Sequence, residues 1–451
     1  MVSFYHQVPA SMSEMIFTLA AFLATGFLFL RKSFYSSALA AVFSTTLFAA
    51  TLIITEFAKM DFSTENPDVV FYEPLKSQAL HALLIFVCLF LALLLWRAPS
   101  GWSWGESTPP EKTFAKATRG FFLVAALALA AVNVQGELIT QAGYHSTEWL
   151  AKQRETYSGI DALWTMLGIC SLIGTLRVYG ARHKNFYVTL GILLAALFYF
   201  KLLRGERSTT FGFLIFLALL YYTISTSRFR GWIILALIPV AFVFLIAWAN
   251  VRGTASEKGL WQSFSEGSSS TLQDIQEGSI AKLDRFPKVT WDLLETTFLY
   301  ENGIHREGAT YWNLIPQMTP SFVAEIIGYE RPLSEPWILA RYFQHGGGIF
   351  MVAEAYWNFG LAGVIGLAII LAWVCVGTEK LYRKLPPVLS YGYYGTVMIG
   401  AETVLVGVQS FLRGLEIGLL VTTMGWVLLR ISQRGTPVSF AKMALGHEPK
   451  E

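Results

Sequence analysis

The sequence predicts an all-α protein that crosses a membrane many times. Of its 451 residues, 54% are apolar and only 14% are charged, whereas soluble domains carry roughly a quarter charged residues. The apolar residues gather in about eleven runs, each close to the ~20 residues that a helix needs to cross a hydrocarbon core. Because every backbone polar group in lipid must be bonded within the protein, we expect these runs to be helices.

The runs divide the chain into a first helical part at residues 1–251, a large polar loop at 252–348, a second helical part at 349–432 and a tail at 433–451. Glycine and alanine are frequent in them, which suits close packing of helices in a membrane. The predicted spans are 15–30, 36–57, 78–96, 120–134, 160–176, 186–203, 209–225, 232–250, 350–376, 392–412 and 415–431.

The positions of lysine and arginine predict the orientation, because short cytoplasmic loops of membrane proteins are enriched in them. When the spans are counted alternately, the N-terminus lies outside, the C-terminus inside, and the polar loop 252–348 outside. The basic segments that then share the cytoplasmic side are 31–32, 97–119, 177–184, 228–230, 380–384 and the tail.

The large outer loop has structure of its own. The run from Gly267 to Ser270 predicts a flexible segment. Prolines divide the end of the loop into short pieces. We therefore expect a small helical cap over the membrane domain, whose cleanest helical spacing falls at Val289, Leu293, Leu294 and Phe298.

Arginines are frequent on the predicted outer side, where cells place few of them. A guanidinium group matches phosphate oxygens with two parallel hydrogen bonds and keeps its charge, so a bound lipid-linked diphosphate is one explanation. Snorkelling to lipid headgroups or pairing with a loop acid is the other explanation. That alternative is weaker where a short turn restricts the side chain, as at Arg204, Arg207 and Arg413. The candidates for binding diphosphate are Arg204, Arg207, Arg285 and Arg413.

A second feature is the segment that begins at Arg341, ends in three glycines and leads into the span at 350–376. Glycines let backbone N–H groups converge on an anion, or let the segment hinge. His345 and Glu354 flank the start of this span, and either is a candidate general base, with Arg341 as a further catalytic candidate. A helix from Phe350 places Glu354 one turn inside, facing the other helices. A structural role for Glu354, as the partner of an arginine, is the alternative.

Other chemistry finds no support in the sequence. HExxH, GxSxG and P-loop motifs are absent, as are CxxC pairs and basic runs, so we predict no cofactor, no metal and no nucleic-acid partner. The cysteines Cys88, Cys170 and Cys375 fall in apolar runs and predict packing residues. Glu402 lies near the middle of its span and is a third site candidate, or else is protonated or paired with a polar neighbour such as Gln409.

Several motifs occur in a suggestive order. They are a short outer turn with Gly205 between two arginines, Asp284-Arg285-Phe286, GATYWNLIPQMTP at 308–320, ERPLSEP at 330–336 and EAYWNFGLAG at 354–363. In this order the chain resembles the bacterial O-antigen polymerases, which are Wzy-type polysaccharide repeat-unit polymerases related in architecture to the O-antigen ligases. The resemblance covers residues 201–363.

The resemblance implies a GT-C-like architecture and glycosyl transfer at the periplasmic face of the bacterial inner membrane. A glycan on undecaprenyl diphosphate would move onto the sugar of an incoming lipid-linked repeat unit. Membrane lipids, a flippase and a chain-length regulator are the further partners that it implies. The family's outer arginines carry over as Arg204, Arg207, Arg285 and Arg341, its acid as Glu354 and the ligase-type histidine as His345.

Physical reasoning leads to a compatible reaction. Nucleotide sugars are confined to the cytoplasm, so an outer donor must arrive already activated on a lipid. Arginines would stabilise the departing diphosphate, a role that a metal has elsewhere, and Glu354 or His345 would accept the proton of the acceptor hydroxyl. Three alternatives stay open. They are a ligase that uses lipid A-core as acceptor, a non-catalytic partner of a polysaccharide machine, and a transporter or flippase, which predicts broken helices and charges along a midplane pathway.

Overall fold

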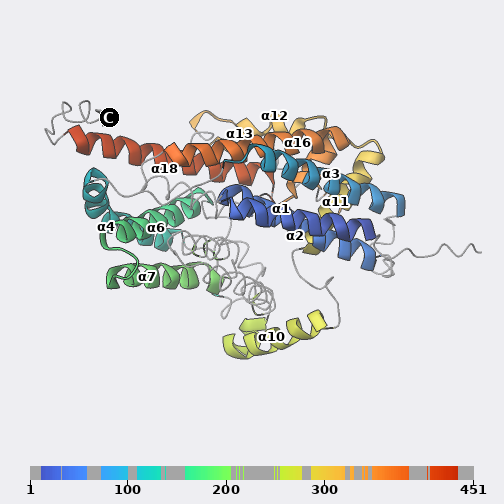
Figure 1. Cartoon of the computed structure of the whole chain (residues 1–451). Helices are drawn as coiled ribbons and strands as arrows, with labels where there is room; N and C mark the ends of the chain where they lie inside the picture. The colour runs from blue at the N-terminus through green and yellow to red at the C-terminus, as the bar shows by residue number, and fades with distance from the viewer. Residues whose placement is uncertain are drawn as a thin grey trace, which may run out of the picture.

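The computed structural model of the chain is a set of helices, many of which run side by side (Figure 1). No strand occurs among the residues that it describes, in agreement with the predicted all-α class. The described residues are 12–31, 33–57, 73–99, 109–133, 138, 158–204, 210, 213, 217, 248, 251, 254–276, 286–319, 326–329, 338–339, 341–343, 348–384, 404 and 407–434.

The first group of helices comprises α1 (Met12–Leu30), α2 (Phe34–Phe57), α3 (Glu73–Arg97), α4 (Pro109–Val132), α6 (Ser158–Tyr179), α7 (Lys184–Phe200) and the 3₁₀ turn η2 (Leu202–Arg204). The second comprises α10 (Leu260–Gln276), α11 (Phe286–Glu301), α12 (Ala309–Trp312), α13 (Leu314–Met318), α16 (Met351–Lys384) and α18 (Val408–Arg434).

Four helical segments among the described residues are long and apolar enough to cross a membrane, namely Pro74–Arg97, Lys112–Val132, Lys184–Arg204 and Met351–Leu381. Helices also cover the predicted spans 15–30, 36–57, 160–176 and 415–431. The predicted spans 209–225, 232–250 and 392–412 lie mostly outside the described residues. The chain is therefore a helical, membrane-embedded protein, and eleven spans remain a prediction.

One apolar core joins α1, α2, α3, α11 and α16. At its centre, Phe43 of α2 packs edge-on against Phe86 and Phe90 of α3, with ring centroids 4.7 and 5.3 Å apart. Elsewhere α4 packs along α6, and α7 lies against both. Large apolar side chains such as Leu23 and Trp373 are exposed on the outside of the helices, which is where a membrane protein meets lipid.

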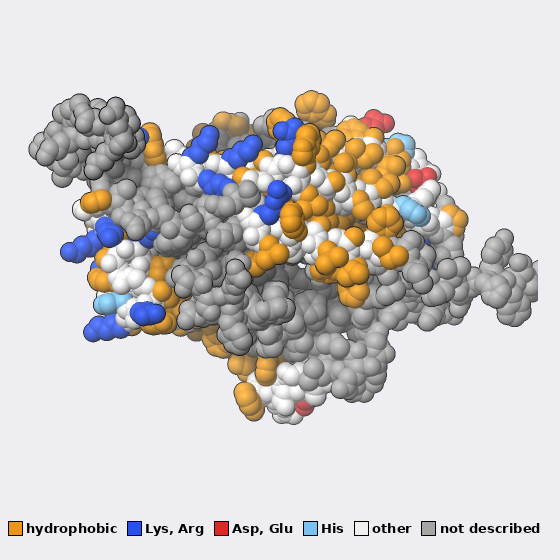
Figure 2. All heavy atoms as spheres, in the orientation of Figure 1, with side chains coloured by type: hydrophobic (Ala, Val, Ile, Leu, Met, Phe, Trp, Pro, Cys, Tyr) orange, Lys and Arg blue, Asp and Glu red, His pale blue; other side chains and the backbone are white. Residues whose placement is uncertain are grey.

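Basic helix ends meet at one end of this core. Arg31 Nη1, after α1, donates to the carbonyl oxygen of Leu95 in α3 at 2.8 Å. Arg383 Nη2, in the last turn of α16, donates to the carbonyl oxygen of Pro99 at 3.0 Å. On the face drawn in Figure 2, Lys and Arg gather toward one end and the top, and several acidic and His side chains lie toward the other. Three basic segments that the sequence predicts to be cytoplasmic thus lie together, and the orientation stays a prediction.

The helix α11, which covers the cleanest helical spacing of the predicted outer loop, packs into this core. It packs against α2, α3 and α16, and its apolar residues Leu293 and Leu294 are buried. Its threonines are buried as well, and their hydroxyls are bonded inside the helix, Thr296 to the carbonyl of Asp292 at 2.7 Å and Thr297 to that of Leu293 at 2.6 Å. Because these polar groups are satisfied locally, a helix from the polar loop can be buried. The predicted flexible segment Gly267–Ser270 is also helical, within α10.

The helix α16 doubles back on itself. The ring of Phe350, just before α16, lies 6.4 Å from the ring of Phe43 in α2. Near the other end of α16, Glu379 accepts a hydrogen bond from the backbone N–H of Ser36, which also belongs to α2. Along α2, Ser36 and Phe43 are only roughly 10 Å apart, whereas a straight α16 would separate Phe350 from Glu379 by about 43 Å. The short arm 351–358 must therefore fold back toward the long arm 361–384.

The hinge of α16 lies at Phe359 and Gly360, the two residues with non-helical dihedral angles. Gly360 has φ +57°, and a Cβ atom there would lie 2.7 Å from the ring of Tyr300 in α11. Only glycine suits both the left-handed backbone and this close approach. A Cβ on Gly363 would overlap the carbonyl oxygen of Ala355, so the two arms touch immediately after the hinge.

Candidate functional site

Glu354, the predicted base, lies on the short arm of α16 and is 2% exposed. It faces the other helices, as predicted. Its Oε2 accepts the backbone N–H of Val408 at 3.1 Å, at the first residue of α18. The N-terminus of a helix presents unpaired N–H groups and a positive dipole end, so it binds a carboxylate favourably. Glu354 thereby fixes α18 to α16.

Two further buried carboxylates bind helix N-termini in the same way. Asp292 Oδ2 of α11 accepts the N–H of Phe350 at 2.7 Å, where α16 begins. Glu379 Oε1 of α16 accepts the N–H of Ser36 at 3.0 Å, in the first turn of α2. A buried carboxylate is strongly unfavourable without such bonds. Sequence reasoning missed both acids, although Asp292 stands out as an acid inside an otherwise clean apolar repeat.

Arg204 ends the turn η2 that follows α7, and only 9% of it is exposed. Its guanidinium carbon lies 5.7 Å from the ring centroid of Tyr199, within the range of a cation–π interaction. The turn is held by Trp248, whose indole N–H donates to the carbonyl of Leu202 at 3.1 Å. This arginine is therefore nearly buried rather than extended into solvent, and most of the predicted turn after it lies outside the described residues.

The turn predicted around Arg413 is wrong. Arg413 lies inside α18, which runs without a break from Val408 to Arg434. The break comes earlier, at Gly407 with φ +130°. Gly414 within the helix is tolerated because an interior glycine costs only about 1 kcal/mol relative to alanine.

Of the remaining candidate residues, the structure describes Arg341 alone. Arg341 is exposed in a turn after Leu339. Arg207, Arg285, His345 and Glu402 lie outside the described residues. The described contacts give Arg204 and Glu354 different neighbours and do not bring them and Arg341 into one cavity. No group of three or more metal-binding side chains occurs among the described residues.

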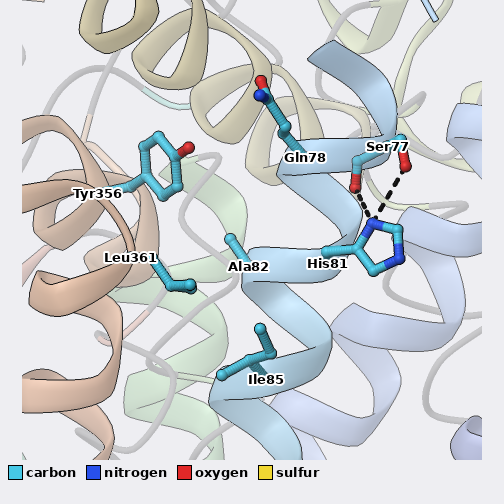
Figure 3. Close-up of a pocket in the computed structure, with 7 residues that line it drawn as sticks. All are labelled: Ser77, Gln78, His81, Ala82, Ile85, Tyr356 and Leu361. Carbon is cyan, nitrogen blue, oxygen red and sulfur yellow. Dashed lines mark hydrogen bonds between the residues drawn. The ribbon is translucent and has the colours of Figure 1, made fainter. Parts of the chain in front are cut away.

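A cavity of about 270 Å³ lies between α3 and the hinge of α16 (Figure 3). In Figure 3, Gln78 and Ala82 follow one side of α3 and face Tyr356 and Leu361 across the gap. None of the predicted site residues lines it. No local sequence pattern indicates this cavity, because its two walls are far apart along the chain. The full lining is Ser77, Gln78, His81, Ala82 and Ile85 of α3 with Tyr356 and Leu361 of α16.

Two polar contacts order the rim of this cavity. His81 Nδ1 lies 2.6 Å from the carbonyl oxygen of Ser77 and 3.0 Å from its hydroxyl. Across the cavity, the Tyr356 hydroxyl donates to Glu301 Oε1 of α11 at 3.0 Å. The cavity is therefore lined by α3 and α16, and α11 holds one of its lining side chains through Glu301.

Comparison with models of known protein families finds none that matches this chain, and no curated protein and no solved structure matches it either.

Proposed function

We propose that this protein is a glycosyltransferase of the bacterial inner membrane that polymerises lipid-linked oligosaccharides on the periplasmic side. The acceptor hydroxyl of an incoming repeat unit attacks the anomeric carbon of the growing glycan. The bond between that carbon and the diphosphate oxygen breaks, and undecaprenyl diphosphate leaves. The acceptor proton passes to Glu354 or His345, and the charge on the leaving diphosphate is stabilised by the outer arginines.

Arg204 is the observation that carries this proposal. It is a nearly buried arginine at the outer end of an apolar span, under the predicted orientation. A cation near the end of a membrane-spanning helix is unfavourable without a partner, and a guanidinium group can bind a diphosphate with two parallel hydrogen bonds. The motif order of residues 201–363 supports the same reading.

Glu354 has a structural reason for its position, because it binds the N-terminus of α18. A carboxylate has two oxygens with several acceptor positions, so a structural bond and proton transfer are not mutually exclusive. His345 is the other base, and the variants Glu354→Gln and His345→Ala distinguish the two. Wild-type rates in both variants would remove both residues from the mechanism.

The test compares Arg204→Ala with a matched arginine. Arg97 also ends an apolar helix and lies over an aromatic ring, Trp96, at 3.8 Å, but on the predicted cytoplasmic end. In cells that depend on this protein for polymer, we expect Arg204→Ala to leave single repeat units on the lipid carrier at normal expression. Arg97→Ala should make long polymer. Long polymer from Arg204→Ala would contradict the proposal.

A flippase is the second candidate, favoured by one observation. The doubled-back α16 resembles the broken helices that form transporter sites. Its N-terminus is bound to Asp292 and that of α18 to Glu354, so neither is open to an anionic substrate in this state. Accumulation of lipid-linked units on the cytoplasmic face, rather than the periplasmic face, in the Arg204→Ala cells would favour the flippase.

A further inference from the structure

Helix α4 changes character along its exposed side. An exposed stripe runs along this helix at four-residue steps, through Lys112, Lys116, Gly120 and Val124. Because residues at this spacing lie above one another on a helix, one side of α4 is basic at its start and apolar further on. This order of side chains suits a helix that passes from the charged headgroups of a membrane into its hydrocarbon core.

Helix α7, which contacts α4, repeats this order. Its exposed stripe begins at Lys184 and continues through the apolar residues Val188 and Ile192, again at four-residue steps. Figure 2 shows Lys and Arg side chains gathered at the left end of the molecule, where Figure 1 places α4 and α7. Two neighbouring helices therefore share one boundary between a basic surface and an apolar surface.

At this boundary, Arg119 of α4 is held in place by the end of α6. Its Nη2 donates to the Tyr179 hydroxyl at 2.7 Å, and its Nη1 donates to the carbonyl oxygen of Lys116 at 2.8 Å. The ring of Tyr179 is stacked on that of His183, with centroids 4.6 Å apart. His183 Nδ1 in turn accepts the N–H of Asn185 at the start of α7. A phenol and a carbonyl hold the guanidinium group, so these contacts fix its position without neutralising its charge.

The cations at this boundary outnumber the acids. Residues 109–132 and 177–184 contain six lysines and arginines but a single acid, Glu111. Within the part of the chain that the structure describes, no acidic side chain forms an ion pair with Arg119 or Lys184. Basic clusters at the ends of membrane helices attract anionic lipid headgroups, and a guanidinium group suits phosphate oxygens in particular.

We infer that the basic starts of α4 and α7 bind an anionic phospholipid. Its phosphate accepts hydrogen bonds from Arg119 and from the Tyr179 hydroxyl, which accepts from Arg119 and keeps its own hydrogen to donate. The apolar stripes favour a lipid over a soluble phosphate, because only a lipid also has chains to cover Val124 and Val188. This inference goes beyond the proposed function and does not depend on it, since lipid binding requires no glycosyl transfer.

The test measures the lipid that the purified full-length protein retains in native mass spectrometry. The probes are phosphatidylglycerol, phosphatidylcholine with the same chains, and inorganic phosphate as a competitor. We expect phosphatidylglycerol to be retained in preference to phosphatidylcholine, and equimolar inorganic phosphate not to displace it. Arg119→Gln and Lys184→Gln should each lower the retention of phosphatidylglycerol by about fivefold, the effect of one cation near a lipid headgroup.

Lys258→Gln is the matched control, because it also removes one exposed cation, but one that is paired with Glu266 at 2.6 Å. It should leave retention unchanged. Lys184 is exposed at the first residue of α7, so its replacement tests the site without disturbing the packing around Arg119. Equal retention of the two phospholipids by the wild-type protein would overturn the inference. Displacement by inorganic phosphate, or unchanged retention in both Arg119→Gln and Lys184→Gln, would overturn it as well.

Discussion

At the scale of single residues, Glu354 combines a candidate catalytic role with a structural one. Glu354→Ala removes the acceptor of the Val408 N–H, and we expect the free energy of unfolding to fall by about 1–3 kcal/mol. Glu354→Gln keeps an amide oxygen as acceptor, so its free energy of unfolding should fall much less. Thermal unfolding in detergent measures both. An alanine variant as stable as the wild type would show that the bond does not hold α18.

The same variants separate stability from chemistry. If Glu354→Gln is as stable as the wild type but makes no polymer, the carboxylate is needed for proton transfer. If it is stable and active, His345 is left as the predicted base. Asp292 and Glu379 offer controls for the structural role alone, because they bind the N-termini of α16 and α2 without being predicted to contact substrate.

At the scale of elements, the hinge of α16 makes the sharpest prediction. Gly360→Ala places a Cβ atom 2.7 Å from Tyr300 and forces alanine into a left-handed backbone. We expect a loss of about 1–3 kcal/mol in the free energy of unfolding. Gly366→Ala, on the same helix, meets nothing within 4 Å and should be neutral or stabilising by up to about 1 kcal/mol. Chemical denaturation of both variants measures the difference, and a Gly360→Ala protein as stable as Gly366→Ala would contradict the hinge.

The sequence predicts these elements better than their arrangement. Apolar runs and helical spacing identified α11 and most of the described spans, because those signals are local. The burial of α11 and the doubling of α16 depend on bonds between residues 58 apart, as from Asp292 to Phe350, which no local pattern reveals. Arg413 and Gly414 resembled a turn because they separate two apolar runs, yet the helix continues through them.

In the candidate site, too, some features could be predicted from the local sequence and others depend on the fold. The inward position of Glu354 followed from its place one turn inside a predicted span. The cavity could not be predicted from the sequence, because one wall comes from Ser77–Ile85 and the other from Tyr356 with Leu361. Only the fold brings these two walls together. A common cavity for the outer arginines stays a prediction, since Arg207 and Arg285 lie outside the described residues.

At the scale of the whole molecule, the orientation in the membrane can be tested by labelling. In a variant without Cys88, Cys170 and Cys375, a cysteine replaces either Asn302 or Lys384, both of which are exposed. Under the predicted orientation, a membrane-impermeant maleimide labels Asn302→Cys in intact cells. It labels Lys384→Cys only after the inner membrane is permeabilised. The reverse pattern would place the proposed site on the cytoplasmic side.

The central claim is that this protein joins lipid-linked glycans with loss of a diphosphate carrier. The most direct measurement mixes the purified protein, reconstituted in lipid, with one purified undecaprenyl-diphosphate-linked repeat unit and follows both products. We predict a ladder of lipid-linked oligomers, with one undecaprenyl diphosphate released for each new glycosidic bond. An unchanged repeat unit and no released carrier, from protein that is folded, would contradict the account.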